Sequence, residues 1–400
     1  MRILEKAFLF LKRLLDKIIH FIWNSWGGGY KKLLSRNPPN EVFEFDEIKD
    51  FVYHPLKTNY LNKILFVESD FQNLYSIYKL IDKKYCDYIL LKNNKDFNNI
   101  KKIFDYKIVV VNSELRFLDK ISKKHQIVVC VWHALGAFKK VGKYNSKVFR
   151  NLYERKYYES FFDFLIVSGS EIVNLYSDAF NMEKKFVLPL GLPQTDKYFD
   201  NDFIKKCKKD FLSKFNFLKN KKIYGFFPTF QEKKWGIYWN INFKKIANLL
   251  NDDEVIVFKL HPTVSIDKSD FYEVENKIID LSHVKNLISL CEFEAIITDY
   301  SSTMFEAMFF NINLVFLRNR QVELERDLWV KYENLPGIII DSSSKEYKKN
   351  PEKIILKNLR IKNQKSNYKK FFEENIGNCD SNNSKRIANF LLEKLEENKI

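Results

Sequence analysis

Beyond Pro38-Pro39, short apolar runs rich in β-branched residues alternate with longer segments in which apolar residues recur at helical spacing. This alternation is typical of α/β proteins, because a buried parallel sheet needs apolar strands and its crossover connections need amphipathic helices. We expect strands in two series, at 63–68, 86–91, 107–112, 127–132 and 163–168, and then at 223–227, 255–260, 295–298, 314–317 and 337–340. Each series predicts a doubly wound, Rossmann-like domain.

The length of the chain allows two such domains. A chain of 400 residues, 46% of them hydrophobic, can bury two cores of ordinary size. The break between the two strand series falls near 190–193, and the basic segment 200–222 follows it. We expect a helix and linker over 1–35, an N-terminal domain over 36–190, a C-terminal domain over 191–375 and a last helix over 376–400. Facing domains would leave a central cleft at the carboxyl ends of both sheets.

Polar residues follow four of the expected strands at the point where each strand ends. They are Trp132-His133-Ala134, Pro228-Thr229, His261-Pro262 and Ser301-Ser302. Open α/β folds bind their ligands at these strand ends. The four polar strand ends together predict a binding site, with His133 in the N-terminal domain and the other three segments in the C-terminal domain.

The run 297–306, ITDYSSTMFE, passes from an apolar strand into consecutive hydroxyl residues at the expected start of a helix. A helix start offers unpaired backbone N–H groups and the positive end of the helix dipole, and hydroxyl side chains add donors. This combination predicts a phosphate site at Ser301 and Ser302. The alternative is a plain helix cap, because Thr303 with Glu306 fits a capping box. Agreement with the other polar strand ends favours the phosphate site.

Two histidines have different candidate roles. His133 follows an apolar strand and could remove a proton from a hydroxyl; a hydrogen-bonded structural histidine is the alternative. His261 belongs to the second strand series and comes two residues after Lys259. It could hold a diphosphate together with Thr229, Ser301 and Ser302.

Other signals narrow the class of enzyme. Glu306 could accept hydrogen bonds from a ribose, with the capping role as its alternative. No GxxxxGK[ST] sequence occurs and no GxGxxG follows the first strand, so neither an ATPase nor a nicotinamide enzyme is favoured. The five cysteines are scattered, which indicates a reducing compartment, and no His/Cys cluster has metal-ligand spacing. We therefore expect no metal and no cofactor.

Residues 1–26 predict an amphipathic helix. At about 100° per residue, charged side chains such as Arg2 and Lys17 share one arc and apolar ones such as Leu15 occupy the other side. Charges interrupt every apolar stretch before the roughly 20 residues needed to cross a bilayer, and a signal peptide's apolar core is missing. With Trp23 and Trp26 at its end, the helix is expected to lie on an anionic membrane surface. The alternative is a helix packed on the body of the protein.

The formal net charge of +16 would suit a nucleic acid, an anionic membrane or a phosphorylated substrate. The basic residues of the chain are scattered, as expected from A/T-rich coding, and they form no stripe with interleaved aromatic residues. We therefore expect no nucleic-acid partner. A non-catalytic basic protein that binds membranes or nucleic acid is the alternative from another class.

Six segments together resemble the CDP-glycerol glycerophosphotransferases, the teichoic-acid primases and polymerases. They are WHALGAFKKVG (132–142), DFLIVSGSEIV (163–173), LGLPQTD (190–196), FFPTFQ (226–231), FKLHP (258–262) and ITDYSSTMFEAMFFNINLVFL (297–317). The resemblance rests on the order and spacing of these segments.

The resemblance implies a two-domain GT-B fold and transfer of glycerol phosphate or ribitol phosphate from a CDP-linked donor to a hydroxyl of a lipid-linked cell-surface glycopolymer, releasing CMP. The polymer would be teichoic acid or capsule, and the enzyme would be peripheral at the cytoplasmic face of the membrane. His133 would match the family's proposed base, with His261 as a second catalytic residue. The implied donor-binding residues are Trp132, Ala134, Pro228, Thr229, Lys259, Ser301, Ser302 and Glu306.

The chain departs from the family pattern in the donor region. Ala134 stands where the family has the glycine of WHG, and Gln194 and Gln231 stand where arginines are usual. Two fixed cations are therefore missing, and Lys233 and Lys234 could replace them only as flexible point charges. The nearer alternative is a CMP-sugar glycosyltransferase of the sialyl- or Kdo-transferase kind. Such an enzyme shares the HP and serine-pair motifs and also releases CMP.

Overall fold

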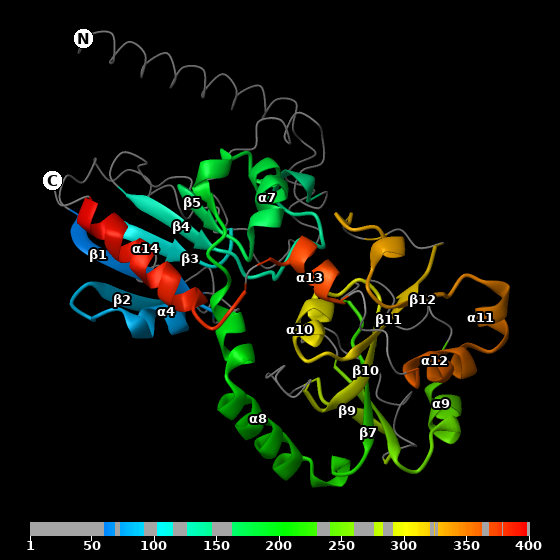
Figure 1. Ribbon diagram of the computed structural model, residues 1–400. Helices are drawn as coiled ribbons and strands as arrows, with labels where there is room; N and C mark the ends of the chain where they lie inside the picture. Colours follow the sequence, from blue (N-terminus) through cyan, green and yellow to red (C-terminus); the bar gives the residue numbers. More distant parts are fainter. Residues whose placement is uncertain are drawn as a thin grey trace, which may run out of the picture. The chain divides into compact units, whose positions relative to one another are not determined.

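Two six-stranded sheets form the framework of the computed structural model (Figure 1). The structure describes residues 60–68, 73–91, 102–114, 126–145, 162–229, 241–259, 276–282, 291–320, 324, 327–361, 368–377 and 379–397. All of them belong to one compact unit, formed by Thr58–Lys92 and Asn98–Ile400. The predicted helix over 1–26, together with Gln231, Lys233, Lys234 and His261, lies outside the described residues.

The first sheet confirms the first series of predicted strands. Its order is β2-β1-β3-β4-β5-β6, and every neighbouring pair is parallel. The strands are β1 (Leu61–Glu68), β2 (Cys86–Leu90), β3 (Tyr106–Val111), β4 (Ile127–Val131), β5 (Phe164–Ile166) and β6 (Val187–Leu188). The sequence does not predict β6, because a strand of two residues is too short to show a period.

The second sheet confirms the second series. Its order is β12-β11-β10-β7-β8-β9, again with parallel pairs throughout. The strands are β7 (Lys222–Phe226), β8 (Glu254–Phe258), β9 (Ile278–Asp280), β10 (Phe293–Thr298), β11 (Asn313–Arg318) and β12 (Ile338–Asp341). The sequence analysis missed the short edge strand β9.

The described helices are mostly short. They are α4 (Tyr75–Leu80), α7 (Val173–Ala179), α8 (Asn201–Lys214), α9 (Phe243–Leu249), α10 (Thr303–Phe309), α11 (Lys345–Lys349), α12 (Pro351–Leu359), α13 (Tyr368–Asn375) and α14 (Asn383–Glu397). The basic segment after the first sheet forms α8, whose start is capped by the Asp200 side chain, an acceptor from two backbone N–H groups at 3.0 Å. No helix in the described ranges is long and apolar enough to span a bilayer.

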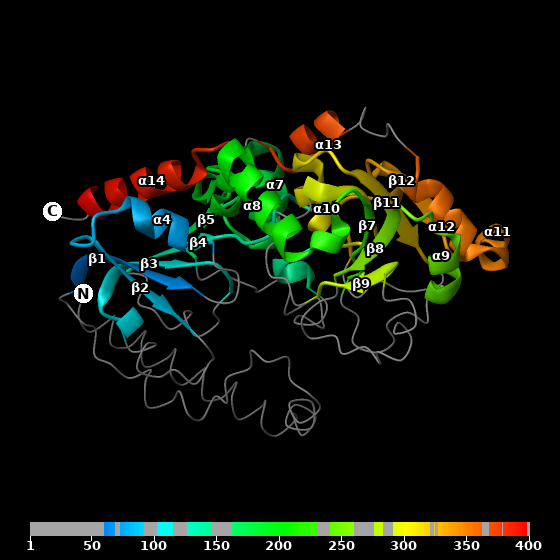
Figure 2. The same ribbon diagram turned by 90° about the horizontal axis from the view of Figure 1, so that it is seen from below.

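Each sheet packs its own apolar core against its own helices. In the second sheet, Phe226, Phe258 and Ile297 pack with Ile355 of α12, and α9 joins the same cluster. The first sheet takes its cover partly from the end of the chain. α14 lies beside α4 over one face of that sheet (Figure 2), and its apolar stripe joins the core around β1, β3 and β4. The helix predicted at the end of the chain is thus present, and it is part of the first core.

Both sheets reverse their strand order at one point. In the first sheet, β2 lies on one side of β1 and β3 lies on the other. In the second sheet, β8 lies on one side of β7 and β10 lies on the other. Ligands of open α/β sheets bind outside the carboxyl ends of the strands at such a switch point. Asn112 follows β3, and Thr229 and Asp299 follow β7 and β10. The fold therefore places the candidate ligand site at these strand ends.

Candidate active site

His133 lies two residues after β4 and is held by the end of the neighbouring strand. Its Nδ1 atom is 2.8 Å from the backbone carbonyl oxygen of Asn112, directly after β3. A carbonyl oxygen can only accept, so Nδ1 carries the proton and Nε2 is the nitrogen able to take up another. The Trp132 ring stacks on the imidazole, with centroids 4.6 Å apart. His133 is partly exposed, while Trp132 is buried.

Gly136 makes the turn after the histidine possible. Its φ of +66° is in the left-handed region, which a residue with a Cβ atom enters only at a cost. A Cβ atom here would also lie 2.7 Å from the carbonyl oxygen of Asn375 and 2.9 Å from Cζ of Phe305. The Tyr176 hydroxyl donates to the Gly136 carbonyl at 3.0 Å. The turn at Gly136 is therefore buried and closely packed.

Asp299 links the ends of β7 and β10 at the switch point of the second sheet. One carboxylate oxygen accepts from the backbone N–H of Thr229 at 2.8 Å and of Tyr300 at 2.6 Å. Burial raises the pKa of Asp299 above its usual value, and the Thr229 side chain and these two amides oppose that effect. Its second carboxylate oxygen and the Thr229 hydroxyl are buried without a hydrogen-bond partner of normal geometry among the described residues.

Ser301 and Ser302 lie in the turn that enters α10. Ser302 is the N-cap residue, its side chain makes no capping hydrogen bond, and Thr303 is the first residue of the helix. The Ser301 hydroxyl lies 3.0 Å from the Thr303 hydroxyl and accepts weakly from the Thr303 N–H at 3.4 Å. The predicted capping box of Thr303 with Glu306 is therefore wrong, because Thr303 is already inside the helix. The N–H of Met304 has only a weak partner, the Ser301 carbonyl at 3.4 Å, whereas the N–H of Phe305 donates to the Ser302 carbonyl at 3.0 Å.

Glu306 lies one turn into α10, with a buried carboxyl group. Its Oε2 atom has no hydrogen-bond partner among the described residues, although the residue as a whole is partly exposed. Burial raises the pKa of Glu306 to about 7, with Lys197 opposing the shift. Burial also lowers the pKa of Lys197. A carboxyl group that titrates near neutral pH inside a candidate site fits a functional role better than a helix cap.

The chain after the histidine turn connects the two regions. Phe138 packs edge-on against Phe305 of α10, with ring centroids 6.1 Å apart. Lys139 Nζ lies 4.6 Å from the centroid of the Tyr300 ring, and the N–H of Trp329 donates to the Phe138 carbonyl at 2.8 Å. The segment that begins with His133 is therefore in direct contact with the segment that carries Ser301 and Glu306.

The remaining predicted residues have less defined surroundings. Pro228 is buried after β7, and Ala134 is partly exposed beside His133. Burial lowers the pKa of Lys259, which follows β8. Within the described ranges, no three His, Cys, Asp or Glu side chains come together as a metal site would require. His261 lies outside these ranges, so its predicted role stays a prediction.

Sequence reasoning missed Asn112 and Asp299. Each directly follows a buried strand, which is the same signal that identified His133 and Thr229. Neither residue stands out in the sequence, because an Asn or Asp after a strand is also a common turn residue. Gln194 was noted only for the arginine it replaces, yet its side chain donates to the His133 carbonyl at 2.9 Å.

Known proteins of one family are similar to this chain. The family model described as CDP-Glycerol:Poly(glycerophosphate) glycerophosphotransferase matches residues 63–393. The teichoic acid ribitol-phosphate polymerase TarL of Staphylococcus aureus is 28% identical over 292 residues, which are 66% of this chain and 50% of TarL. A teichoic acid poly(ribitol-phosphate) polymerase of Bacillus spizizenii is 26% identical over 385 residues, 88% of this chain and 57% of the relative. The chain thus spans about half the length of these relatives.

Solved structures give the fold. The wall teichoic acid polymerase TagF superposes with a TM-score of 0.65 at 19% identity, over 85% of this chain and 91% of the TagF chain. A UDP complex of S. aureus MnaA gives a TM-score of 0.56 at 15% identity, over 84% of this chain and 97% of the other. These matches, with two parallel doubly wound sheets, confirm the predicted GT-B-like α/β fold. The chain belongs to the CDP-glycerol:poly(glycerophosphate) glycerophosphotransferase family.

Proposed function

We propose that this chain transfers a polyol phosphate, glycerol phosphate or ribitol phosphate, from a CDP-linked donor to a hydroxyl of a lipid-linked cell-surface glycopolymer. The observation that carries the proposal is the bond between His133 Nδ1 and the Asn112 carbonyl, because it leaves Nε2 as the basic nitrogen at a strand end of this family's fold. A base at this position suits an enzyme that activates a hydroxyl. Teichoic acid and capsule are both polymers of the proposed class.

The proposed chemistry is a single in-line displacement. His133 Nε2 takes the proton of the acceptor hydroxyl as that oxygen forms a bond to the β-phosphorus of the donor. The bond between the β-phosphorus and the bridging oxygen breaks, and CMP leaves with that oxygen. Positioning and charge stabilisation provide most of the acceleration in such reactions.

The donor diphosphate is proposed to bind at the switch point of the second sheet. The Thr229 hydroxyl and the hydroxyls of Ser301 and Ser302 would donate to phosphate oxygens, beside the N–H groups that begin α10. Lys139 adds positive charge next to Tyr300. A ribose hydroxyl would donate to the buried Oε2 of Glu306. His261 and Lys259 are proposed to take part from the end of β8, as the family resemblance implies.

A donor panel tests the proposal. Purified protein is incubated with CDP-glycerol, CDP-ribitol and CMP-linked sugars, each with a lipid-linked acceptor, and the product is analysed by mass spectrometry. A new phosphodiester with release of CMP, lost in His133→Ala, is the expected result. A new glycosidic bond formed from a CMP-sugar would overturn the proposal in favour of a glycosyltransferase.

We further propose that the enzyme works at the cytoplasmic membrane face, bound to anionic lipid through residues 1–26. The support is the sequence pattern of that segment, a basic polar arc, a wide apolar face and two terminal tryptophans. Deletion of residues 1–26 should release the protein from sedimenting vesicles that contain anionic lipid. Full retention of the deletion variant with the vesicles would contradict this proposal.

A further inference from the structure

We propose that Gln194 and Asn73 are positioning residues for His133, because with Asn112 they close a ring of hydrogen bonds through the histidine. The inference rests on the proposed role of His133 as the base. It concerns residues outside the motif that carries the histidine, at the start of α4 and in the turn after β6. We call Asn73, Asn112 and Gln194, together with His133, the amide ring.

The amide ring can be followed bond by bond. His133 Nδ1–H donates to the Asn112 carbonyl at 2.8 Å, and Asn112 Nδ2 donates to Asn73 Oδ1 at 3.0 Å. Asn73 Nδ2 reaches Gln194 Oε1 at 3.5 Å, the weakest link, and also donates to the Trp132 carbonyl at 3.3 Å. Gln194 Nε2 then donates to the His133 carbonyl at 2.9 Å. The ring therefore holds the histidine by its imidazole and by its own peptide group.

Burial makes these bonds expensive to break. Asn73 is 3% exposed and Asn112 is 1% exposed, so an amide group that lost its partner there could not turn to water instead. Networks of this kind fix one geometry when every member is satisfied. A rotation of the imidazole would cost the bond to Asn112, and a shift of its peptide would cost the bond to Gln194. The proposed base is thereby kept in one orientation and one tautomer.

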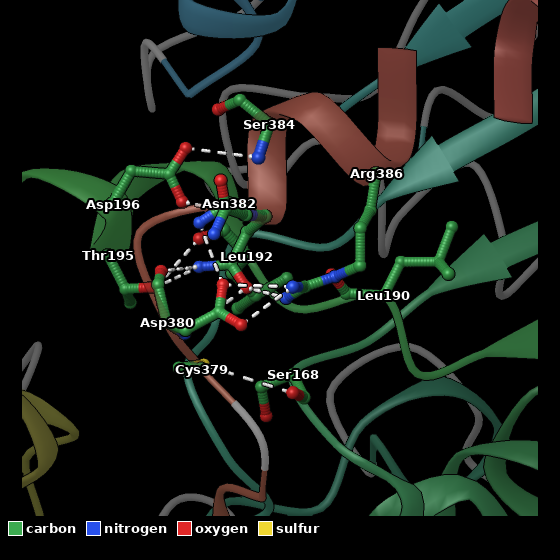
Figure 3. Close-up of polar contacts among 11 residues, drawn as sticks. Ser168, Leu190, Leu192, Thr195, Asp196, Cys379, Asp380, Asn382, Ser384 and Arg386 are labelled. Atoms are coloured by element: carbon green, nitrogen blue, oxygen red, sulfur yellow. Dashed lines mark hydrogen bonds and ion pairs between the residues drawn. The ribbon is translucent and has the colours of Figure 1, made fainter. Parts of the chain in front are cut away.

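Gln194 is itself anchored through the two residues that follow it, Thr195 and Asp196. Asp196 accepts from the N–H groups of Asn383 and Ser384, both at 3.0 Å, and so caps the start of α14. Thr195 Oγ1 accepts from Asn383 Nδ2 at 2.9 Å. Figure 3 shows Thr195 and Asp196 facing the start of α14. The turn that carries Gln194 is thus fixed to the last helix of the chain, and it cannot move without unpairing these groups.

Glutamine suits this position because it can make two bonds of the ring at once. A side-chain amide both donates and accepts, so Gln194 can bond the His133 carbonyl and accept from Asn73 at the same time. A guanidinium group only donates. An arginine here would leave the amide ring open between Asn73 and position 194.

The test compares two hydrogen-bonded glutamines in the full-length protein, the partly exposed Gln194 and the buried Gln126. Gln194→Met removes the amide at similar size, and Gln126→Met is the matched control. Gln126 Nε2 donates to the carbonyls of Ile103 and Tyr106 at 3.0 and 2.7 Å, at the other end of the first sheet's strands from His133. We expect kcat of Gln194→Met to fall by about 10- to 100-fold, as for a misplaced catalytic group, with KM for the donor within about twofold. Gln126→Met should lower thermal stability and leave kcat unchanged.

A second readout does not depend on activity. In protein labelled with ¹⁵N-histidine, the His133 imidazole, assigned by its loss in His133→Ala, should show the Nδ1–H tautomer in the wild type and in Gln126→Met. Gln194→Met should show a mixture of tautomers. If no CDP-polyol is used by the wild type, the proposed function fails, and the tautomer measurement alone decides the positioning role.

Wild-type kcat together with an unchanged tautomer in Gln194→Met would overturn the inference. If that variant does not fold, Gln194→Arg replaces it, since arginine keeps a donor for the His133 carbonyl. That variant should retain kcat within about threefold, because it keeps a donor for the His133 carbonyl and loses only the bond from Asn73, at 3.5 Å the weakest link of the ring. A loss of more than about tenfold in a folded Gln194→Arg protein would contradict the assignment.

Discussion

The two regions that carry the candidate residues differ in how their buried polar atoms are satisfied. At the first sheet, the amide ring closes through His133, and Trp132 Nε1 is the one atom nearby that is buried without a hydrogen-bond partner in the described ranges. At the second sheet, Asp299 Oδ2, Thr229 Oγ1 and Glu306 Oε2 are all in that state. The region around His133 thus has one such atom, and the region around α10 has three.

This difference fits the two roles proposed. A base must be held in one orientation before the substrate arrives, so its hydrogen bonds are made within the protein. A donor site keeps polar groups for its ligand, at a cost of about 1–3 kcal/mol for each buried group left unsatisfied. The ligand recovers part of that cost when it binds. The first region should therefore control turnover, and the second should control affinity and stability.

The largest effect is expected from a substitution in the first region, the one around His133. His133→Ala should lower turnover by about 10²–10⁴-fold, because general-base help is lost, and CDP affinity should stay within about threefold. Steady-state kinetics and calorimetry measure the two quantities. Turnover like that of the wild type would remove His133 from the mechanism.

Gly136→Ala tests the connection between the regions. The added Cβ atom would meet the Asn375 carbonyl and the Phe305 ring, and the positive φ adds strain, so we expect a loss of about 3 kcal/mol in the free energy of unfolding. Denaturant unfolding measures this loss, and kcat should fall as well because the histidine turn moves.

The matched control is Gly337→Ala, another crowded glycine. Its Cβ atom would lie 2.5 Å from the Leu314 carbonyl, beside β11. It should lose stability while the folded fraction keeps its kcat. Equal kinetic effects of the two variants would argue against a special role of the turn at Gly136.

A double serine substitution tests the second region, at the start of α10. Ser301→Ala with Ser302→Ala should weaken CDP binding by about 10- to 100-fold, as expected when bonds to a charged group are lost, while the His133 tautomer is unchanged. Ser342→Ala with Ser343→Ala is the control, a serine pair that also follows a strand, where the hydroxyls bond Arg318 and Asp341. Unchanged CDP affinity in the first variant would contradict the phosphate site.

Glu306→Gln tests the burial of the donor-side carboxyl group. Its pKa is raised to about 7 in the folded protein, so between the ordinary value of 4.5 and about 7 the folded state keeps a proton that the unfolded state has lost. Stability therefore falls as pH rises through that window. A glutamine does not ionise, and the variant should be more stable than the wild type by about 1–3 kcal/mol at pH 8 and equal to it below pH 4.5.

Unfolding curves recorded across this pH range measure the difference. Glu352→Gln is the control, because that buried carboxylate accepts from the Asn242 N–H at 2.9 Å and its loss should bring no gain. If Glu306→Gln shows no pH-dependent gain, the carboxyl group is not held in the buried state described.

The smallest effect is expected from chelation. Activity should survive EDTA, because the described residues offer no cluster of metal ligands on either side. A loss of activity that added Mg²⁺ restores would overturn this prediction.

Much of the fold was predictable because its signal is local. An apolar β-branched run such as 107–112 and the polar residue after a strand, as at His133 or Thr229, are visible within a few positions. The edge strands β6 and β9 were missed, since they have two and three residues. The capping box of Thr303 with Glu306, the alternative to the phosphate site, is not formed, because spacing alone does not say where a helix begins.

The sequence by itself determined the α/β class, the two strand series, the polar strand ends and the resemblance to a phosphotransferase family. Tertiary structure alone decided which groups satisfy one another. Gln194 and Asn73 are 121 positions apart, and Asp196 caps a helix that begins 187 positions later. The burial that shifts the Glu306 carboxyl likewise comes from the packing around α10. Hydrogen-bond partners and burial depend on distances in space, and these are set only when the two sheets and the last helix are packed.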